Sequence, residues 1–266
     1  MSKGMLIDLT KCIGCRGCQV ACKQWNDLPA EKTEYDTEFT NPQNRSAYTW
    51  TLVEFHTTER DGKPVSTFTK TQCMHCLEPG CESACIAKAI TRDEATGAVV
   101  VNHDKCIGCR YCMVACPFHV PKYEYDKLFP KMQKCTMCYD RISAGMQPAC
   151  AATCPNEAIL FGDRDELLKT AKARIKKGNG KYVDHVYGEQ EAGGTAVLYI
   201  SGAPLELTAL NTKVTTDEVP SYTWKAMKQL PFLLGAVGAV SLGLRAYSNR
   251  RAKIEEEAVA TKEESR

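Results

Sequence analysis

Sixteen cysteines divide into four groups of four along the 266-residue chain, with none left over. The first and third groups read C-x2-C-x2-C-x3-C, within the nearly repeated stretches KCIGCRGCQVACKQW and KCIGCRYCMVACPFH. The second group widens the middle gap to four residues and the fourth to eleven, yet both also end in C-x3-C. Groups I to IV are Cys12, Cys15, Cys18 and Cys22; Cys73, Cys76, Cys81 and Cys85; Cys106, Cys109, Cys112 and Cys116; and Cys135, Cys138, Cys150 and Cys154.

This spacing favours iron–sulfur clusters over zinc or disulfides. Zinc sites usually pair two C-x2-C knuckles across a longer loop, and disulfide scaffolds suit short secreted chains. Neither accounts for the C-x3-C tails. In bacterial ferredoxins the first three cysteines hold one cubane and the fourth ligates a neighbouring one. Pro117 and Pro155 follow the last cysteine of groups III and IV, as in ferredoxins, whereas Lys23 and Ile86 stand there in groups I and II. We therefore expect four [4Fe–4S] clusters.

Because the fourth ligand crosses to another cluster, the groups must work in pairs. Between Cys85 and Cys106 the stretch AITRDEATGAVVVNHD predicts a strand, a turn at 93–97 and a second strand, the hairpin found between two ferredoxin motifs. Group II would then pair with III, and group I with IV. Only 18 residues separate Cys116 from Cys135, so spacing alone also allows III with IV. The shared tails CIAKAI and CPNEAI indicate one two-cluster module inserted into another.

The remaining soluble segments predict a few regular elements. AYTWTLVEF and VSTFTK are typical of strands joined by a turn at DGKP from Asp61, and DLPAEKTEYDTEFTNPQN is typical of a polar loop that either shields a cluster or docks a partner. DRDELLKTAKARIKKGNG predicts a helix stopped by Gly178, GGTAVLYISG a strand, and LELTALNTKVTTDEVPS an extended linker. We expect an α+β fold of two intertwined ferredoxin-like modules with an inserted β segment.

A C-terminal apolar segment predicts a membrane anchor. Gln229–Leu244 has no charge over 16 residues, about 24 Å of helix, short of the roughly 30 Å hydrocarbon core. Snorkelling lysines and arginines, with Trp224 and Tyr247 at the interfaces, could close the gap. The alternative is a buried hydrophobic helix. More basic residues follow the segment (Arg245, Arg250, Arg251 and Lys253) than precede it (Lys225 and Lys228), which predicts a cytoplasmic tail and a periplasmic cluster domain at the inner membrane.

The expected domains are 1–160 for the four clusters, 161–220 for helix, strand and linker, 221–248 for a single-pass transmembrane helix, and 249–266 for a charged, disordered tail. MSKGMLIDLTK has no secretory apolar stretch. The net charge of +2 gives no indication of nucleic acid, and no nucleotide motif or catalytic site is evident.

His75 and His119 could tune cluster potentials, although ordinary packing is the simpler interpretation. Lys131, Lys134 and Arg141 flank Cys135 and Cys138, where they could raise a potential or be solvated.

These motifs resemble the four-cluster, ferredoxin-type β subunits of molybdopterin oxidoreductases and related membrane-bound hydrogenases. LIDLTKCIGCRGCQVACKQWND, CMHCLEPGC, CIGCRYCMVACPFHVPKYEYD, KCTMCYDRISAGMQPACAATCPNEAILFG and GGTAVLYI carry the resemblance over nearly the whole chain. QVACKQWND, YTWTLVEF and the single C-terminal helix are most similar to the β subunit of formate dehydrogenase, whereas GEQEAGGTAVLYISGAP is also similar to nickel–iron hydrogenase subunits.

The resemblance implies the ligand sets and the partners. Cluster 1 would take Cys12, Cys15, Cys18 and Cys154; cluster 2 Cys22, Cys135, Cys138 and Cys150; cluster 3 Cys73, Cys76, Cys81 and Cys116; and cluster 4 Cys85, Cys106, Cys109 and Cys112. The chain would conduct electrons in anaerobic respiration from a molybdenum or tungsten bis-pterin α subunit, which oxidises formate, to a membrane cytochrome b-type γ subunit or other quinone-reactive subunit. An α subunit with a twin-arginine signal would carry it across the membrane. The alternatives are a hydrogenase or other quinone-linked oxidoreductase, and a structural protein, for which one cluster would suffice.

Overall fold

The computed structural model describes residues 2–33, 39–60 and 63–264. The chain divides into two compact units, Met1–Pro220 and Ser221–Arg266. Helices and short strands alternate throughout the first unit, which is therefore a mixed α+β fold, and the second unit is helical.

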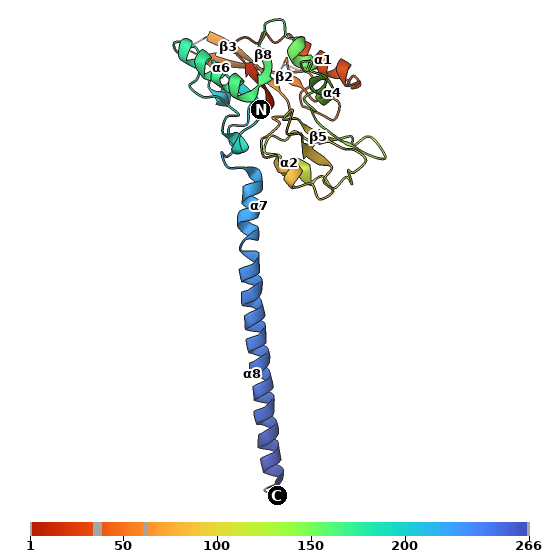
Figure 1. Ribbon diagram of the computed structural model, residues 1–266, viewed down its shortest axis with the longest axis vertical. Helices are drawn as coiled ribbons and strands as arrows, with labels where there is room; N and C mark the ends of the chain where they lie inside the picture. The colour runs from red at the N-terminus through yellow and green to blue at the C-terminus, as the bar shows by residue number, and fades with distance from the viewer. Residues whose placement is uncertain (1, 34–38, 61–62, 265–266) are drawn as a thin grey trace. The chain divides into compact units, whose positions relative to one another are not determined.

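A three-stranded sheet forms the centre of the first unit. Its order is β8 (Ile159–Asp163), β1 (Lys3–Asp8) and β9 (Val197–Ile200), with β1 antiparallel to β8 and parallel to β9. Helix α6 (Arg164–Lys177) covers one face of this sheet (Figure 1). The predicted helix at 163–180 and strand at 193–202 are thus confirmed, with tighter bounds.

Both faces of the central sheet are buried, which explains its continuous apolar runs. Side chains alternate along a strand: Leu6 and Leu198 pack under α6, whereas Met5 and Val197 belong to the larger core on the opposite face. That larger core also holds buried cysteines, namely Cys73, Cys116, Cys135 and Cys150. The central sheet therefore separates an ordinary aliphatic core from a core built around sulfur.

Three hairpins complete the β structure. The long one pairs β2 (Leu52–Arg60) with β3 (Lys63–Thr71) in antiparallel register. The others pair β4 (Ile90–Arg92) with β5 (Val99–Val101), and β6 (Lys122–Tyr123) with β7 (Met132–Gln133). The hairpin predicted between groups II and III is confirmed as β4–β5. Strand β2 begins five residues later than the predicted start at 47, and the turn predicted from Asp61 lies outside the described residues.

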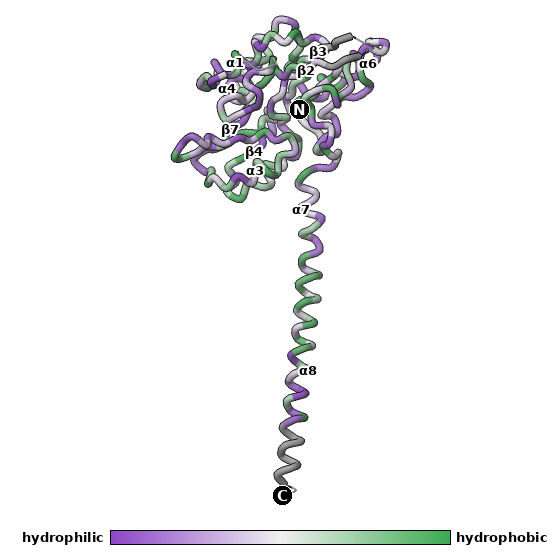
Figure 2. The backbone as a smooth tube through the Cα atoms, turned by 180° about the vertical axis from the view of Figure 1, so that it is seen from behind, coloured by the Kyte–Doolittle hydropathy of each residue, from purple (hydrophilic) through white to green (hydrophobic). Residues whose placement is uncertain are grey.

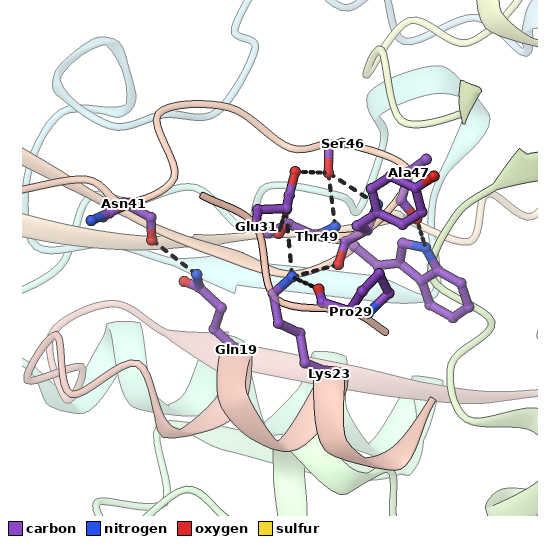
Figure 3. Close-up of polar contacts among 10 residues, drawn as sticks. Gln19, Lys23, Pro29, Glu31, Asn41, Ser46, Ala47 and Thr49 are labelled. Atoms are coloured by element: carbon purple, nitrogen blue, oxygen red, sulfur yellow. Dashed lines mark hydrogen bonds and ion pairs between the residues drawn. The ribbon is translucent and has the colours of Figure 1, made fainter. Parts of the chain in front are cut away.

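Polar contacts fasten the segment between the first cysteine group and β2 (Figure 3). The Lys23 ammonium donates to the backbone oxygen of Tyr48 at 2.7 Å and to that of Pro29 at 3.0 Å, and it pairs with Glu31. The Glu31 carboxylate also accepts from the hydroxyls of Ser46 and Thr49. Burial raises the pKa of Glu31, but these hydrogen bonds and the Lys23 charge outweigh it, so the net pKa is lowered.

Short helices carry or follow the cysteines. They are α1 (Gly17–Trp25), α2 (Gly80–Ser83), α3 (Tyr111–Val114), α4 (Tyr139–Ser143) and α5 (Ala149–Ala152). Two 3-10 turns follow, η1 (Glu191–Gly193) and η2 (Leu205–Leu207). The segment expected to be an extended linker instead packs on the sulfur-rich core through four partly buried side chains, Leu205, Leu210, Val214 and Val219.

The second unit consists of helix α8 (Leu230–Glu264) and most of α7 (Val219–Met227). Figure 2 shows the first half of α8 as hydrophobic and the part that follows as hydrophilic. Because α8 extends to Glu264, the tail that was expected to be disordered is helical as far as this residue. Among the described residues, one stretch, Val219–Glu255, is long and apolar enough to cross a membrane, with a mean hydropathy of 1.5 and none of its best window buried. Its large apolar side chains, such as Phe232 and Leu242, are exposed, unlike those of a soluble core helix.

Candidate metal centres

Each cysteine group combines a tight loop with a helical turn. In the C-x2-C loops of groups I and III, Gly14 and Gly108 have φ of 68° and 74°. Arg16 and Arg110 then adopt the left-handed conformation directly before α1 and α3. A Cβ at Gly14 would lie 3.0 Å from the Phe68 ring, so this loop needs glycine for both its conformation and its close approach. The sequence repeat is therefore also a repeat of backbone geometry.

The first set of cysteines comes from groups I and IV. Cys12, Cys15, Cys18 and Cys154 line one cavity of about 420 Å³, together with the apolar side chains of Ile7, Val53 and Ile159. Strand β1 runs directly into this set, because Cys12 follows its end by four residues. The fourth cysteine of this set, Cys154, follows α5, which packs beside α1.

The second set also comes from groups I and IV. Cys22, Cys135, Cys138 and Cys150 line another cavity of about 270 Å³, with Met5, Trp50 and Pro148 among its other walls. The helices α1, which contains Cys22, and α4, which follows Cys138, also contact each other. The Trp25 indole donates to Asp140 at 2.9 Å, and the Arg141 guanidinium lies 4.3 Å from the centre of the same indole ring. Helices α1 and α4 are thereby joined beside the second set.

The third and fourth sets come from groups II and III. Burial raises the pKa of Cys76 well above its usual value, and the charges of Cys73, Cys116 and Cys81 raise it further. Burial likewise raises the pKa of Cys112 to about 11, with added repulsion from Cys106, Cys109 and Cys85. The third set is thus Cys73, Cys76, Cys81 and Cys116, and the fourth set is Cys85, Cys106, Cys109 and Cys112. Like the first two, both sets combine two groups of the sequence.

The sets suit a multi-atom inorganic group better than a single ion. Thiolates around one zinc ion converge to about 2.3 Å from a single point. Among the described residues, no three or more His, Cys, Asp or Glu side chains are placed to hold one metal ion. In the two cavities, four sulfurs from separate segments of the chain instead surround a common space. A cubane with four sulfur ligands at its corners fits this arrangement.

Backbone amides already point at some of these sulfurs. The N–H of Ala89 donates to the Cys85 sulfur at 3.2 Å, and the N–H of Met137 donates to the Cys135 sulfur at 3.4 Å. Hydrogen bonds to ligand sulfurs raise the reduction potential of a cluster, because they stabilise the extra negative charge of the reduced form.

Sulfurs of different sets lie close enough to act on one another electrostatically. Such interactions occur between Cys18 and Cys150, between Cys135 and Cys73, and between Cys81 and Cys112. They relate the first set to the second, the second to the third, and the third to the fourth. Of the sixteen cysteines, the two that are exposed are Cys15 and Cys109, which belong to the first and fourth sets. The first and fourth sets therefore approach the surface.

The basic residues and histidines that flank the cysteines differ in burial and in their contacts. Lys134 is buried, Lys131 is exposed, and Arg141 stacks on Trp25. His75 is fully buried, accepts a hydrogen bond from the N–H of Val99 at 2.9 Å, and has a pKa lowered by burial and by the nearby Lys134 and Lys70. A neutral ring that accepts at Nδ1 carries its proton on Nε2, and this Nε2 has no partner among the described residues. His119 is exposed.

Sequence reasoning missed Lys70. It lies on β3 and is fully buried, although a lysine in a polar strand is ordinarily taken as solvated. The sequence did contain a signal that Lys70 faces the interior. Alternate residues of a strand share a face, so Lys70 shares one with Phe68. The Phe68 ring packs edge-on against Phe55.

Comparison with known proteins agrees with this geometry. A family model described as a 4Fe-4S dicluster domain matches residues 65–164, which contain groups II, III and IV. A protein of Nitratidesulfovibrio vulgaris is 45% identical over 98% of this chain and 71% of its own length. The nitrate-inducible formate dehydrogenase iron-sulfur subunit of Escherichia coli K12 is 42% identical over 73% of this chain and 66% of its own length. The hydrogenase-2 operon protein HybA of Escherichia coli O157:H7 is 35% identical over 95% of this chain and 85% of its own length.

The match to HybA extends beyond the cysteine motifs to almost the entire chain. The match to the formate dehydrogenase subunit is higher in identity but shorter. Together with the sixteen cysteines, these similarities show that the chain belongs to the family of 4Fe-4S dicluster iron–sulfur subunits related to the formate dehydrogenase iron–sulfur subunits and HybA.

Proposed function

We propose that the chain is an electron relay with four [4Fe–4S] clusters, one held by each cysteine set. The observation that carries the proposal is the gathering of cysteines from distant parts of the sequence around common sites, and we propose that the four sets lie in one row. Cluster 1 is held by the first set, and clusters 2, 3 and 4 by the second, third and fourth sets. Each cluster, when bound, accepts and releases one electron without bond making.

The protein's own part is to hold, insulate and bias these clusters. The sulfurs of Cys135 and Cys150 are buried among apolar side chains, which exclude water from the middle of the row. A one-electron relay needs no acid, base or nucleophile, so we assign the catalysis to a partner subunit. Electrons enter and leave at the two ends, where Cys15 and Cys109 approach the surface.

Exposed apolar side chains surround both ends of the row. Ile13 and Val20 lie beside the first set in sequence, and Ile107, Tyr111 and Val114 lie beside the fourth. We assign these faces to the two partners, a bis-pterin catalytic subunit containing molybdenum or tungsten and a membrane cytochrome b or other quinone-reactive subunit. The last residues of the first unit lie beside α2, since a Cβ at Gly80 would come 2.7 Å from Val219. Because α2 carries Cys81 of the third set and Cys85 of the fourth set follows it, we assign the membrane partner to the face formed by these two sets.

The apolar part of α8 acts as a single-pass anchor in the cytoplasmic membrane. Its exposed leucines, valines and phenylalanine have no covering partner within the second unit. The larger number of basic residues after the apolar segment supports a tail in the cytoplasm and a cluster domain in the periplasm.

Formate oxidation by the catalytic partner is the function we favour. The 42% identity to a formate dehydrogenase iron-sulfur subunit supports it. A hydrogenase partner is the second candidate, and the observation in its favour is the near full-length match to HybA.

The test is anaerobic purification of the full chain with whatever subunits remain bound. We expect about sixteen iron and sixteen sulfide per chain, because each cubane contains four of each. About four zinc without sulfide would refute the relay. Identification of the bound large subunit, together with cluster reduction by formate or by hydrogen, distinguishes the two branches.

A further inference from the structure

Two lysines are buried inside the row of cysteine sets. Lys70 on β3 is 2% exposed and Lys134, just after β7, is 3% exposed. Lysine is almost never fully buried without an ionic partner. Yet neither ammonium forms an ion pair with a carboxylate within residues 2–33, 39–60 and 63–264.

Lys70 lies between the first and second sets. Its ammonium donates to the side-chain oxygen of Gln72, and its backbone oxygen accepts from the Tyr199 hydroxyl at 2.9 Å, which fixes this end of β3. The strongest charge interactions of this ammonium are with the sulfurs of Cys150, Cys18, Cys135 and Cys22. One comes from the first set and three from the second.

Lys134 lies between the second and third sets. Its ammonium donates to the backbone oxygens of Val99 and Cys135, and it is 4.0 Å from the Cys73 sulfur. It also acts electrostatically on Cys81. The fourth set differs, because the largest influences on Cys112 are its burial and the thiols of Cys106, Cys109 and Cys85, and no lysine is among them. The basic residues nearest the fourth set in sequence, Lys105 and Arg110, are exposed and therefore screened by water.

An isolated buried ammonium is strongly unfavourable. The hydrogen bonds to neutral oxygens satisfy its protons but do not neutralise its charge. The compensating charge available in this fold is that of the cluster-bearing thiolates. Each lysine must in turn favour the state of the cluster with the more negative charge, which is the reduced state.

We infer that Lys70 and Lys134 are potential-setting residues, which raise the reduction potentials of clusters 1 and 2 and of cluster 3 relative to cluster 4. This inference rests on the proposed relay. It makes the three clusters at the Cys15 end of the row more favourable electron sites than the cluster at the Cys109 end. The two charges are built into the protein interior, so salt screens them far less than surface charges.

The experiment is an anaerobic redox titration of the membrane-extracted full-length protein with its bound subunits, followed by electron paramagnetic resonance. In Lys70→Met, we expect the one-electron reduction equilibrium of at least one of clusters 1 and 2 to fall about tenfold, which is about 59 mV. Cluster 4 should not move. Lys70→Arg keeps the charge and should restore most of the potential. Lys131→Met removes an exposed lysine near the same group and is the matched control.

Gln72→Glu tests the same idea if Lys70→Met does not load its clusters. It keeps an oxygen acceptor for the ammonium but neutralises the local charge, so the potential should fall in the same direction. Iron and sulfide content separates the two claims. Fully loaded Lys70→Met and Gln72→Glu variants whose potentials move no more than those of Lys131→Met would overturn the inference and leave the relay intact. A wild-type protein that holds no sulfide would overturn the relay itself.

Discussion

The ion pair at the end of β1 leads to a quantitative prediction. Asp8 is fully buried, and its carboxylate accepts from the Arg174 guanidinium at 2.9 Å, the Tyr182 hydroxyl at 3.0 Å and the Thr10 hydroxyl at 2.7 Å. This network joins the last turns of α6 to the segment that leads into Cys12. Loss of Arg174 would leave a buried carboxylate without its counter-charge.

Arg174→Ala should therefore be strongly destabilising. Removal of one partner from a buried ion pair costs about 3–5 kcal/mol, and we take the lower end because the Arg174 side chain is 25% exposed. For a domain of this size, each kcal/mol lowers the melting temperature by about 2–4 °C, so the expected drop is about 6–12 °C. Lys172→Ala is the control, because Lys172 is 56% exposed in its pair with Glu189, and such pairs contribute about 1 kcal/mol or less.

The assay is an anaerobic thermal melt of the cluster-loaded protein, followed by far-ultraviolet circular dichroism. All variants must be scanned at one rate, because loss of clusters makes unfolding irreversible. A melting temperature of Arg174→Ala that equals that of Lys172→Ala would refute the reasoning, since the buried network would then contribute no more than a surface pair.

Three further predictions concern the clusters, pH and the membrane. Cys154→Ala should lower the iron content from about sixteen to about twelve by loss of cluster 1, with clusters 3 and 4 unchanged in their paramagnetic resonance signals; loss of a cluster from the other pair would contradict the assigned sets. The folded-state pKa of Glu31 is lowered, so its stabilising contribution exists above the unfolded pKa of about 4.3 and disappears as the pH falls through the folded pKa. The urea midpoint of Glu31→Gln should thus lie below that of the wild type at about pH 6 and converge with it near pH 3, whereas a constant difference would rule out this linkage. Deletion of Gln229–Arg245 should move the protein from the membrane to the soluble fraction, and unchanged fractionation would count against the anchor.

Local patterns predicted the local elements well. The amphipathic stretch with Gly178 at its end became α6, and the turn signal at Gly97 became the β4–β5 hairpin, in which the N–H of Gly97 donates to the Asp93 oxygen at 2.7 Å. Both depend on interactions between residues close in sequence. The cysteine spacing was equally informative, because ligation imposes a fixed geometry on short loops.

Contacts between residues far apart in the sequence could not be predicted from local patterns. Residues 205–219 have the composition of a linker, but the core accepts their scattered apolar side chains. Lys70 was missed because its surroundings come from β3, α1 and the fourth cysteine group, which the fold brings together from distant parts of the chain. The delayed start of β2 has a local cause, since the Trp50 indole donates to the Ala47 oxygen at 2.8 Å and holds 47–51 in bends.

The same features show why folding and cluster insertion must be coupled. Without clusters, several buried thiols would have to remain protonated, since burial raises the pKa of Cys18 and of Cys81 to about 12 and that of Cys138 to about 11. The buried ammonium groups of Lys70 and Lys134 would then lack any compensating charge. Ligation removes both penalties at once, because the thiolates become ligands and counter-charges together. In the proposed relay, the sulfur-rich side of the core would therefore derive much of its stability from the clusters that it holds.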